Sequence, residues 1–263
     1  MVQSRHPQPR KSILITGASS GIGAALAQAL STSGRTLALL GRDEARLDAI
    51  ADACRAKGAQ CKVGVIDICD HAAMADFISL FEREHGIDLL VLNAGIMTGR
   101  PADNALETGA AAQRLLEINL VAAIDTLHLA LPGMLQRRRG EIVFMASLSG
   151  LAPLQDAPAY SASKAALLSY GVALRDAVAE SGINVMVVCP GYVATPMVAK
   201  HRGARPGEVS AADAARRILK GLDANKGLIG FPIWLYWLSR VALLAPEFLR
   251  RKTMSLFRFH LDA

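Results

Sequence analysis

The sequence has few aromatic residues, no paired-cysteine motif and no long block of like charge. Aromatic side chains make up 5% of the 263 residues, and most apolar residues are Ala, Leu, Ile and Val. The four cysteines form no Cys-x-x-Cys pair and have no Cys/His spacing typical of metal sites, so we expect free thiols, a reducing compartment and no metal. The densest basic cluster covers only residues 137–139, which argues against a nucleic-acid partner.

Internal repeats, low-complexity segments and Pro/Ser-rich linkers are also missing. The chain is 52% hydrophobic and 20% charged, which excludes a largely disordered protein. No apolar core follows the basic residues near the N-terminus, so we expect no signal peptide and a cytoplasmic location. The net charge of +6 is mildly basic and suits a phosphate-bearing cofactor or an anionic membrane surface.

Short apolar runs alternate with longer segments of helical periodicity. The runs predict strands at 11–16, 36–40, 61–66, 88–92, 141–145 and 184–188. The segments between and after them predict helices at 21–33, 43–57, 71–84, 111–136 and 160–181. Because the apolar runs are continuous, we expect strands that are buried on both faces. The order predicts an α/β fold, a single-domain, doubly wound, mostly parallel sheet of the Rossmann-like type.

A glycine-rich turn follows the first predicted strand. Gly17, Gly21 and Gly23 have the spacing G-x-x-x-G-x-G at the junction with a predicted helix. Glycines at such a turn let backbone N–H groups approach a pyrophosphate, which the helix N-terminus then stabilises. Ser19 and Ser20 add hydroxyl groups that can reach phosphate. The turn favours a nucleotide site over an ordinary strand-to-helix connection.

The end of the second predicted strand indicates which nucleotide. Sites selective for NAD place an acid about 20 residues after the glycines, where it binds the ribose 2′-hydroxyl. Gly41 and Arg42 occupy that place here, and a guanidinium suits a 2′-phosphate. Asp43 follows, and we expect it to cap the next helix. The residues predict that the cofactor is NADP(H) rather than NAD(H). The alternative is that Arg42 is only a solvated surface residue and binds no cofactor.

Tyr160 and Lys164 share one face of a predicted helix, because they are separated by one helical turn. A lysine cation beside a phenol favours the phenolate and lowers the tyrosine pKa from about 10 toward neutrality. Tyr160 would then be a general acid or base. Ser147 ends the fifth predicted strand, and its hydroxyl could bind the same substrate oxygen. Tyrosine and lysine are also common on helix surfaces, so the pair alone is weak evidence.

Further segments complete a family pattern. TGASSGIG (16–23), LNAG (92–95), Asn119, Ser147, YSASK (160–164) and PGYVATP (190–196) together resemble the classical short-chain dehydrogenase/reductases, in order and in spacing, from about residue 11 to 197. Leu92 departs from the family, which often has Asn there. The resemblance implies an NADP-dependent oxidoreductase that transfers a hydride between NADP(H) and a carbonyl or secondary alcohol.

The resemblance also implies a role for each matching residue. Tyr160 would donate or accept the proton, and Ser147 would orient the substrate carbonyl. Lys164 would hold the nicotinamide ribose and lower the pKa of Tyr160, while Asn119 would hold a water of a proton relay. Asp67 would lie beside the adenine. The implied cofactor-binding residues are Gly17, Ser19, Ser20, Gly21, Ile22, Gly23, Arg42, Asp67, Ile68, Asn93, Ala94, Gly95, Tyr160, Lys164, Pro190, Gly191, Val193 and Thr195.

The C-terminal part carries the expected substrate specificity. We expect an N-terminal extension at 1–10, the catalytic domain at 11–230 and an apolar, basic segment at 231–263. Residues 195–210 include His201 and three cations, which suggest a basic lid or, slightly favoured, a solvated mobile loop. Residues 227–238 begin with a last strand and continue into an amphipathic helix with two tryptophans. That helix could lie on a membrane, form a hydrophobic substrate mouth, contact another subunit or pack in the core.

The leading hypothesis is therefore an NADP(H)-dependent enzyme acting on a small, lipophilic carbonyl or alcohol. A 3-oxoacyl or ketosphinganine-like lipid reductase is the alternative with the same site. A catalytically silent nucleotide-binding regulator or scaffold is a further alternative, but such a protein would often lack Ser147, Tyr160 or Lys164. A structural protein of the membrane surface would leave this set unexplained. The resemblance implies a homodimer or homotetramer that pairs through the fourth and fifth helices.

Overall fold

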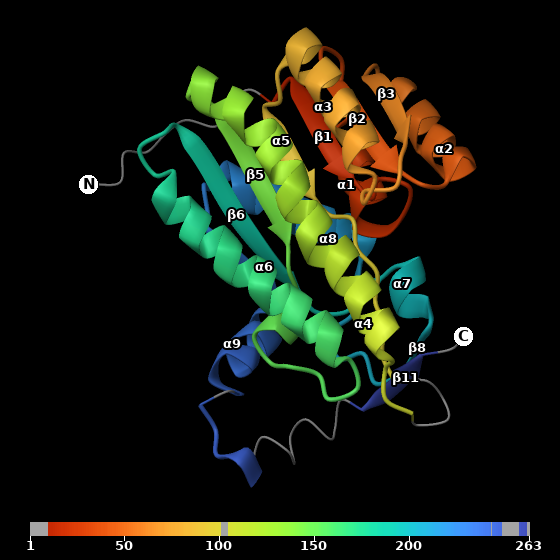
Figure 1. Cartoon of the computed structure of the whole chain (residues 1–263), viewed down its shortest axis with the longest axis vertical. Coiled ribbons are helices and arrows are strands. Elements are labelled where there is room, and N and C mark those ends of the chain that lie inside the picture. The colour runs from red at the N-terminus through yellow and green to blue at the C-terminus, as the bar shows by residue number, and fades with distance from the viewer. Residues whose placement is uncertain (1–9, 101–104, 243, 249–257, 262–263) are drawn as a thin grey trace.

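The computed structural model describes residues 10–100, 105–242, 244–248 and 258–261, and its centre is a parallel sheet (Figure 1). In the described chain, seven strands have the order β10-β6-β5-β4-β1-β2-β3, and all of their pairings are parallel. The strands are β1 (Ser12–Thr16), β2 (Thr36–Gly41), β3 (Gln60–Val65), β4 (Leu89–Leu92), β5 (Gly140–Met145), β6 (Ile183–Pro190) and β10 (Leu228–Phe231). The predicted doubly wound α/β fold is confirmed.

Helices cover both faces of this sheet and form two buried clusters. One face carries α3 (His71–His85), α5 (Ala122–Arg137) and α6 (Pro158–Ala177), which cross in front of the strands in Figure 1. The other face carries α1 (Gly21–Leu30), α2 (Glu44–Arg55) and α8 (Ala211–Asp223). Leu14 packs into the first cluster and its neighbours Ile13 and Ile15 into the second, because successive strand residues point to opposite faces.

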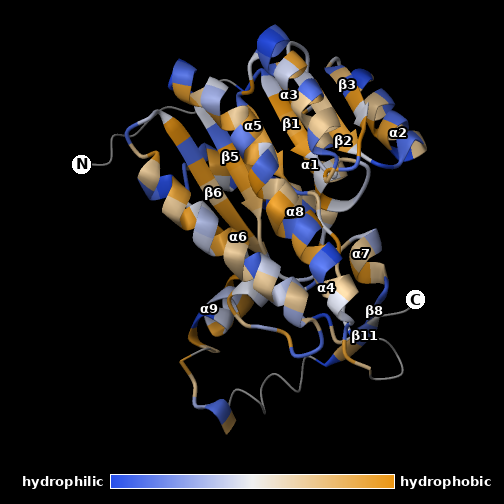
Figure 2. Ribbon diagram, in the orientation of Figure 1, coloured by the Kyte–Doolittle hydropathy of each residue, from blue (hydrophilic) through white to orange (hydrophobic). Residues whose placement is uncertain are grey.

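Burial on both faces holds for the central strands but not for β3. Every residue of β1, β4 and β5 is buried, and Figure 2 shows hydrophobic ribbons in the middle of the sheet. In β3, three of the six residues are exposed, including Val65, because this strand lies at the sheet edge and has a neighbour on one side only. The expectation of two-sided burial is therefore wrong for this strand.

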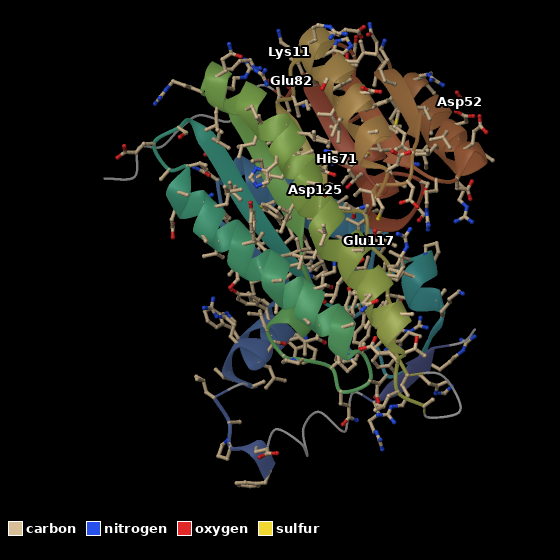
Figure 3. The ribbon with its side chains drawn as sticks, viewed as in Figure 1. Lys11, Asp52, His71, Glu82, Glu117 and Asp125 are labelled. Carbon is tan, nitrogen blue, oxygen red and sulfur yellow. The ribbon has the colours of Figure 1, made fainter. Side chains whose placement is uncertain are left out.

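The helix predicted at 111–136 extends from Gly109 to Arg137 in the structure and contains a π-helical turn. The structure has α4 (Gly109–Leu116), the π-turn η1 (Glu117–Val121) and then α5, without a break in the helix. Exposed charges such as Glu117 and Asp125 point outward from it (Figure 3). By length and composition alone this helix could cross a membrane, but half of its most apolar window is buried within the fold. We therefore assign it as a core helix.

Residues 195–210 contain short regular elements and so are not the continuous loop that was expected, while their expected mobility stays a prediction. They include α7 (Pro196–Ala199), β8 (His201–Gly203) and β9 (Val209–Ser210). β9 pairs with β7 (Val193–Ala194), and β8 pairs antiparallel with β11 (Phe259–Leu261). The cations Lys200 and Arg202 are exposed, but His201 is buried.

The amphipathic helix expected after the last strand is α9 (Ile233–Ala242). Residues 249–257 and 262–263 of the expected segment at 231–263, and residues 1–9 of the expected extension at 1–10, lie outside the described residues. The domain limits at 10 and 230 stay predictions.

Candidate active site

The carboxyl ends of the central strands open on a cleft of about 430 Å³. A cleft at this edge of a doubly wound sheet is the usual ligand site of the fold. The sequence-predicted residues that line it are Gly17, Ser19, Ser20, Gly21, Ile22, Arg42, Asp67, Ile68, Asn93, Ala94, Gly95, Ser147, Tyr160, Lys164, Pro190, Gly191, Val193 and Thr195. Gly23 and Asn119, which were predicted with them, are not part of the lining but lie next to the lining residues Gly17 and Gly95.

The glycine-rich turn is held against the end of β4. Gly17 has a φ of +67°, and a Cβ there would lie 2.8 Å from the Cα of Ala94. The Asn93 side chain donates through Nδ2 to the carbonyl oxygens of Thr16 and Gly17, both at 3.0 Å. A Cβ on Gly23 would lie 2.3 Å from the Gly17 oxygen. Gly23 therefore permits close helix–strand packing, and Asn93 clamps the turn.

Helix α1 begins at this turn with its first N–H groups unsatisfied by a side-chain cap. In the described chain, Asp43, Asp70 and Ser210 cap α2, α3 and α8, whereas Ser20 makes no capping hydrogen bond to α1. The role expected of Asp43 is thus confirmed. Gly21 and Ile22 of the uncapped first turn line the cleft. Free N–H groups at a helix N-terminus favour an anionic ligand such as phosphate.

Two guanidinium groups lie at the end of the cleft formed by β2 and α2. Arg42 is 63% exposed and lies 3.8 Å from the Asp67 carboxylate. Hydrogen bonding from the Cys69 backbone N–H, with Arg114 and Arg42 nearby, lowers the pKa of Asp67. Arg46 also lines the cleft, although sequence reasoning missed it. Its place in the first turn of α2, four residues after Arg42, was the available signal.

Tyr160, Lys164 and Ser147 meet where α6 faces the end of β5. The Lys164 Nζ lies 5.6 Å from the centroid of the Tyr160 ring and donates to the Met145 carbonyl oxygen at 2.8 Å. The Ser147 and Tyr160 side chains lie together in the lining of the cleft, and the Ser147 hydroxyl donates to the Pro190 carbonyl oxygen at 3.5 Å. Ser147 Oγ also accepts from the Ser149 backbone N–H at 3.1 Å, which fixes its position.

Burial decides the protonation of this pair. It raises the pKa of the Tyr160 phenol, which the Ser147 hydrogen bond offsets only in part. It lowers the pKa of Lys164 to about 8, because the charged form loses hydration. The expectation that Lys164 lowers the Tyr160 pKa toward neutrality is therefore wrong for this chain. The two side chains share a face, but burial raises the pKa of Tyr160, which is therefore a neutral phenol near pH 7.

Asn119 occupies the π-turn with its amide group fully engaged. Its Oδ1 accepts from the Ile96 N–H at 2.7 Å, and its Nδ2 donates to the Ile96 oxygen at 2.8 Å and to Ser163 Oγ at 3.4 Å. Both amide hydrogens are used within the protein, so the side chain positions the loop that begins at Gly95, in a π-turn of the kind frequent at functional sites. The water expected at Asn119 stays a prediction.

A second cavity, of about 100 Å³, shares Ser147, Tyr160 and Gly191 with the cleft. Its walls are mainly apolar and come from the β4–α4 connection, η2 (Leu148–Gly150), α7 and α9. Leu235 and Leu238 of α9 line it, so one face of the amphipathic helix serves as a cavity wall. Sequence reasoning left this as one of four alternatives for the helix.

Comparisons with known proteins agree with this geometry. A family model described as short chain dehydrogenase matches residues 11–206. A ketoacyl reductase of Nostoc sp. is 35% identical over 185 residues, which cover 70% of this chain and 63% of that protein. A short-chain dehydrogenase from Sphingobium yanoikuyae, solved in complex with NADPH, is 27% identical with a TM-score of 0.77 and covers 96% of this chain and 98% of its own.

A bulky-bulky ketone specific alcohol dehydrogenase from Comamonas testosteroni is 25% identical with a TM-score of 0.76, and the match covers 94% of this chain and 95% of that one. The chain belongs to the short-chain dehydrogenase family of oxidoreductases.

Proposed function

We propose that this short-chain dehydrogenase reduces the carbonyl group of an apolar small molecule with NADPH. The observation that carries the proposal is the place of two hydroxyl groups. Ser147 and Tyr160 both line the cleft that begins at the glycine-rich turn and also the apolar cavity. A carbonyl held by these hydroxyls would lie between a cofactor in the cleft and an apolar body in the cavity.

The residues present fit a dinucleotide and the chemistry of reduction. A nicotinamide cofactor bound in the cleft would supply the hydride to the carbonyl carbon. As negative charge grows on the carbonyl oxygen, the Ser147 and Tyr160 hydroxyls stabilise it, and Tyr160 donates its proton to complete the alcohol. The raised pKa of Tyr160 keeps this proton in place near neutral pH. The Lys164 ammonium beside the ring stabilises the phenolate that remains.

The preference for NADP(H) over NAD(H) rests on charge at the β2 end of the cleft. Gly41 and Arg42 stand where an NAD-selective site has an acid, and Arg46 adds a second guanidinium to the lining. Asp67 faces Arg42 at 3.8 Å, too far for a hydrogen bond, so the Arg42 fork is available to a 2′-phosphate. The uncapped N-terminus of α1 suits the pyrophosphate.

Replacing Tyr160 with Phe tests the function directly. We expect turnover of ketones with NADPH to fall by roughly 10²-fold or more, because the proton donor is removed. Binding of NADPH, followed by its fluorescence, should change little. Tyr170→Phe on the same helix is the matched control, since Tyr170 bonds to His128 rather than to the site. Full turnover by the Tyr160→Phe variant would refute the assignment.

A 3-oxoacyl reductase is the second candidate, favoured by the similarity to the Nostoc ketoacyl reductase. A panel of ketones and 3-oxoacyl thioesters with NADPH separates the two. If no carbonyl in such a panel is reduced, the silent nucleotide-binding protein becomes the better hypothesis.

The outer face of α9 supports a contact with a membrane surface. Trp234, Trp237 and Val241 are 52–58% exposed, and none of them lines the cavity. Tryptophan is favoured at the bilayer interface, and Arg240 adds a nearby cation for anionic lipid. We propose that a cytoplasmic enzyme docks through this face, which would place the cavity near lipophilic substrates.

The homodimer or homotetramer implied by resemblance stays part of the proposal. Val121 and Leu135 of the η1–α5 helix and Val172 of α6 are exposed apolar residues on the two helices expected to pair. Burial of such side chains would favour association.

A further inference from the structure

The apolar cavity beside Tyr160 is lined by two buried polar side chains without partners. His201 is 2% exposed and Ser149 is 5% exposed, and both line the cavity. Within the described residues, neither imidazole nitrogen of His201 nor the Ser149 hydroxyl has a hydrogen-bond partner. Folded proteins satisfy most buried polar groups, so each exception calls for an explanation such as a ligand.

The His201 ring is fixed in place by its neighbours. It stacks on the Phe259 ring, with 4.3 Å between centroids and 17° between planes, and meets the edge of the Tyr192 ring at 5.1 Å. Phe259 is held in turn, because its backbone N–H donates to the Asp156 carboxylate at 3.1 Å. The ring is thus presented to the cavity by packing that uses none of its nitrogens.

His201 is neutral in this setting. Burial lowers the pKa of His201, and the charges of Arg205 and His260 lower it further. A neutral imidazole offers one hydrogen-bond donor and one acceptor, which is the complement of a hydroxyl group or an amide. Among the described residues, the cavity lining contains no Lys, Arg, Asp or Glu side chain, so nothing there would compensate a charged group.

We propose that His201, assisted by Ser149, determines substrate specificity by hydrogen-bonding a second, uncharged polar group of the substrate. The substrate class is an apolar ketone that carries a hydroxyl or amide in addition to the carbonyl reduced at Tyr160. Apolar walls such as Leu154, Leu235 and Leu238 would bury its hydrocarbon body. This inference rests on the proposed carbonyl reduction and adds a substrate class to it.

Matched ketone pairs test the inference. In each pair, one ketone carries a hydroxyl and the other a methyl group at the same carbon, and the position varies along the series. The wild type should show a kcat/KM at least tenfold higher for the hydroxyl member of at least one pair. For that member, His201→Phe, which retains an aromatic ring to stack on Phe259, should lose at least tenfold, mainly in KM. The methyl member should change less than twofold.

Two further variants separate specificity from folding. Ser149→Ala should lower kcat/KM for the hydroxyl member by at least threefold without affecting its partner. His260→Phe, the same change at an exposed site of the adjoining strand β11, should leave both members unchanged.

Equal losses for both members of every pair, in both cavity variants, would show a merely structural role and overturn the inference. So would a wild type without preference in any pair. Failure of the proposed function is distinguishable, because it would appear as ketone turnover that survives Tyr160→Phe.

Discussion

Replacing Lys164 with Met should remove a pH dependence from the folding stability. Lys164 is 5% exposed, and burial lowers its pKa from 10.5 to about 8. The unfolded chain therefore binds this proton more tightly than the folded chain does, and the free energy of unfolding rises with pH. The penalty of roughly 3 kcal/mol is fully present below about pH 8 and disappears as the pH approaches 10.5.

The effect is measurable between pH 7 and pH 9. Between these pH values the penalty from Lys164 falls by about 1 kcal/mol. For a chain of this size, that change shifts the Tm by roughly 2–4 °C. Thermal unfolding of the wild type and of Lys164→Met at both pH values gives the difference. The melting temperature of the wild type should rise by that amount relative to the variant.

The comparison cancels other titrating groups. Burial raises the pKa of Cys61 to about 11 and of Cys189 to about 12, so both thiols weaken folding as the unfolded cysteines ionise near pH 9. Both thiols are present in both proteins. Loss of the Lys164 charge would raise the pKa of Cys189 further above 9, so folded Cys189 stays protonated at pH 9 in either protein and both contributions drop out of the difference. The variant also loses the hydrogen bond to the Met145 carbonyl, which a neutral amine can donate as well as an ammonium can. Parallel stability curves would refute the desolvation of Lys164.

Two further predictions concern the cofactor and the membrane. Arg42→Ala should raise the KM for NADPH at least tenfold and change the KM for NADH less than threefold, because the guanidinium is proposed to bind only the 2′-phosphate. Steady-state kinetics with both cofactors measure the two KM values. Equal changes in the two KM values would contradict the NADP(H) preference. The double change Trp234→Ala with Trp237→Ala should reduce co-sedimentation with anionic phospholipid vesicles several-fold. Leu80→Ala alters an exposed apolar residue of α3 and is the control, which should leave co-sedimentation unchanged. Equal co-sedimentation of the wild type, the double variant and the control would count against docking through α9.

Much of the fold could be predicted because each pattern is local. The run at 11–16 and the glycines after it specify a buried strand and a tight turn whatever surrounds them. The capping role of Asp43 follows from its own place before α2. The π-turn around Asn119 could not be foreseen, since the surrounding sequence has ordinary helical periodicity and the extra residue is accommodated only by packing against α6 and the loop at Ile96.

The sequence by itself determined the alternation of strands and helices, the glycine-rich turn and the presence of Tyr160 and Lys164 on one helical face, because these depend on neighbours along the chain. Only the tertiary structure decided their electrostatics. Burial by distant segments raises the pKa of Tyr160 and lowers the pKa of Lys164. The structure also brought His201 beside the Phe259 ring and into the lining of the cavity next to Tyr160. Desolvation depends on every group packed around a site, and a linear pattern does not contain that information.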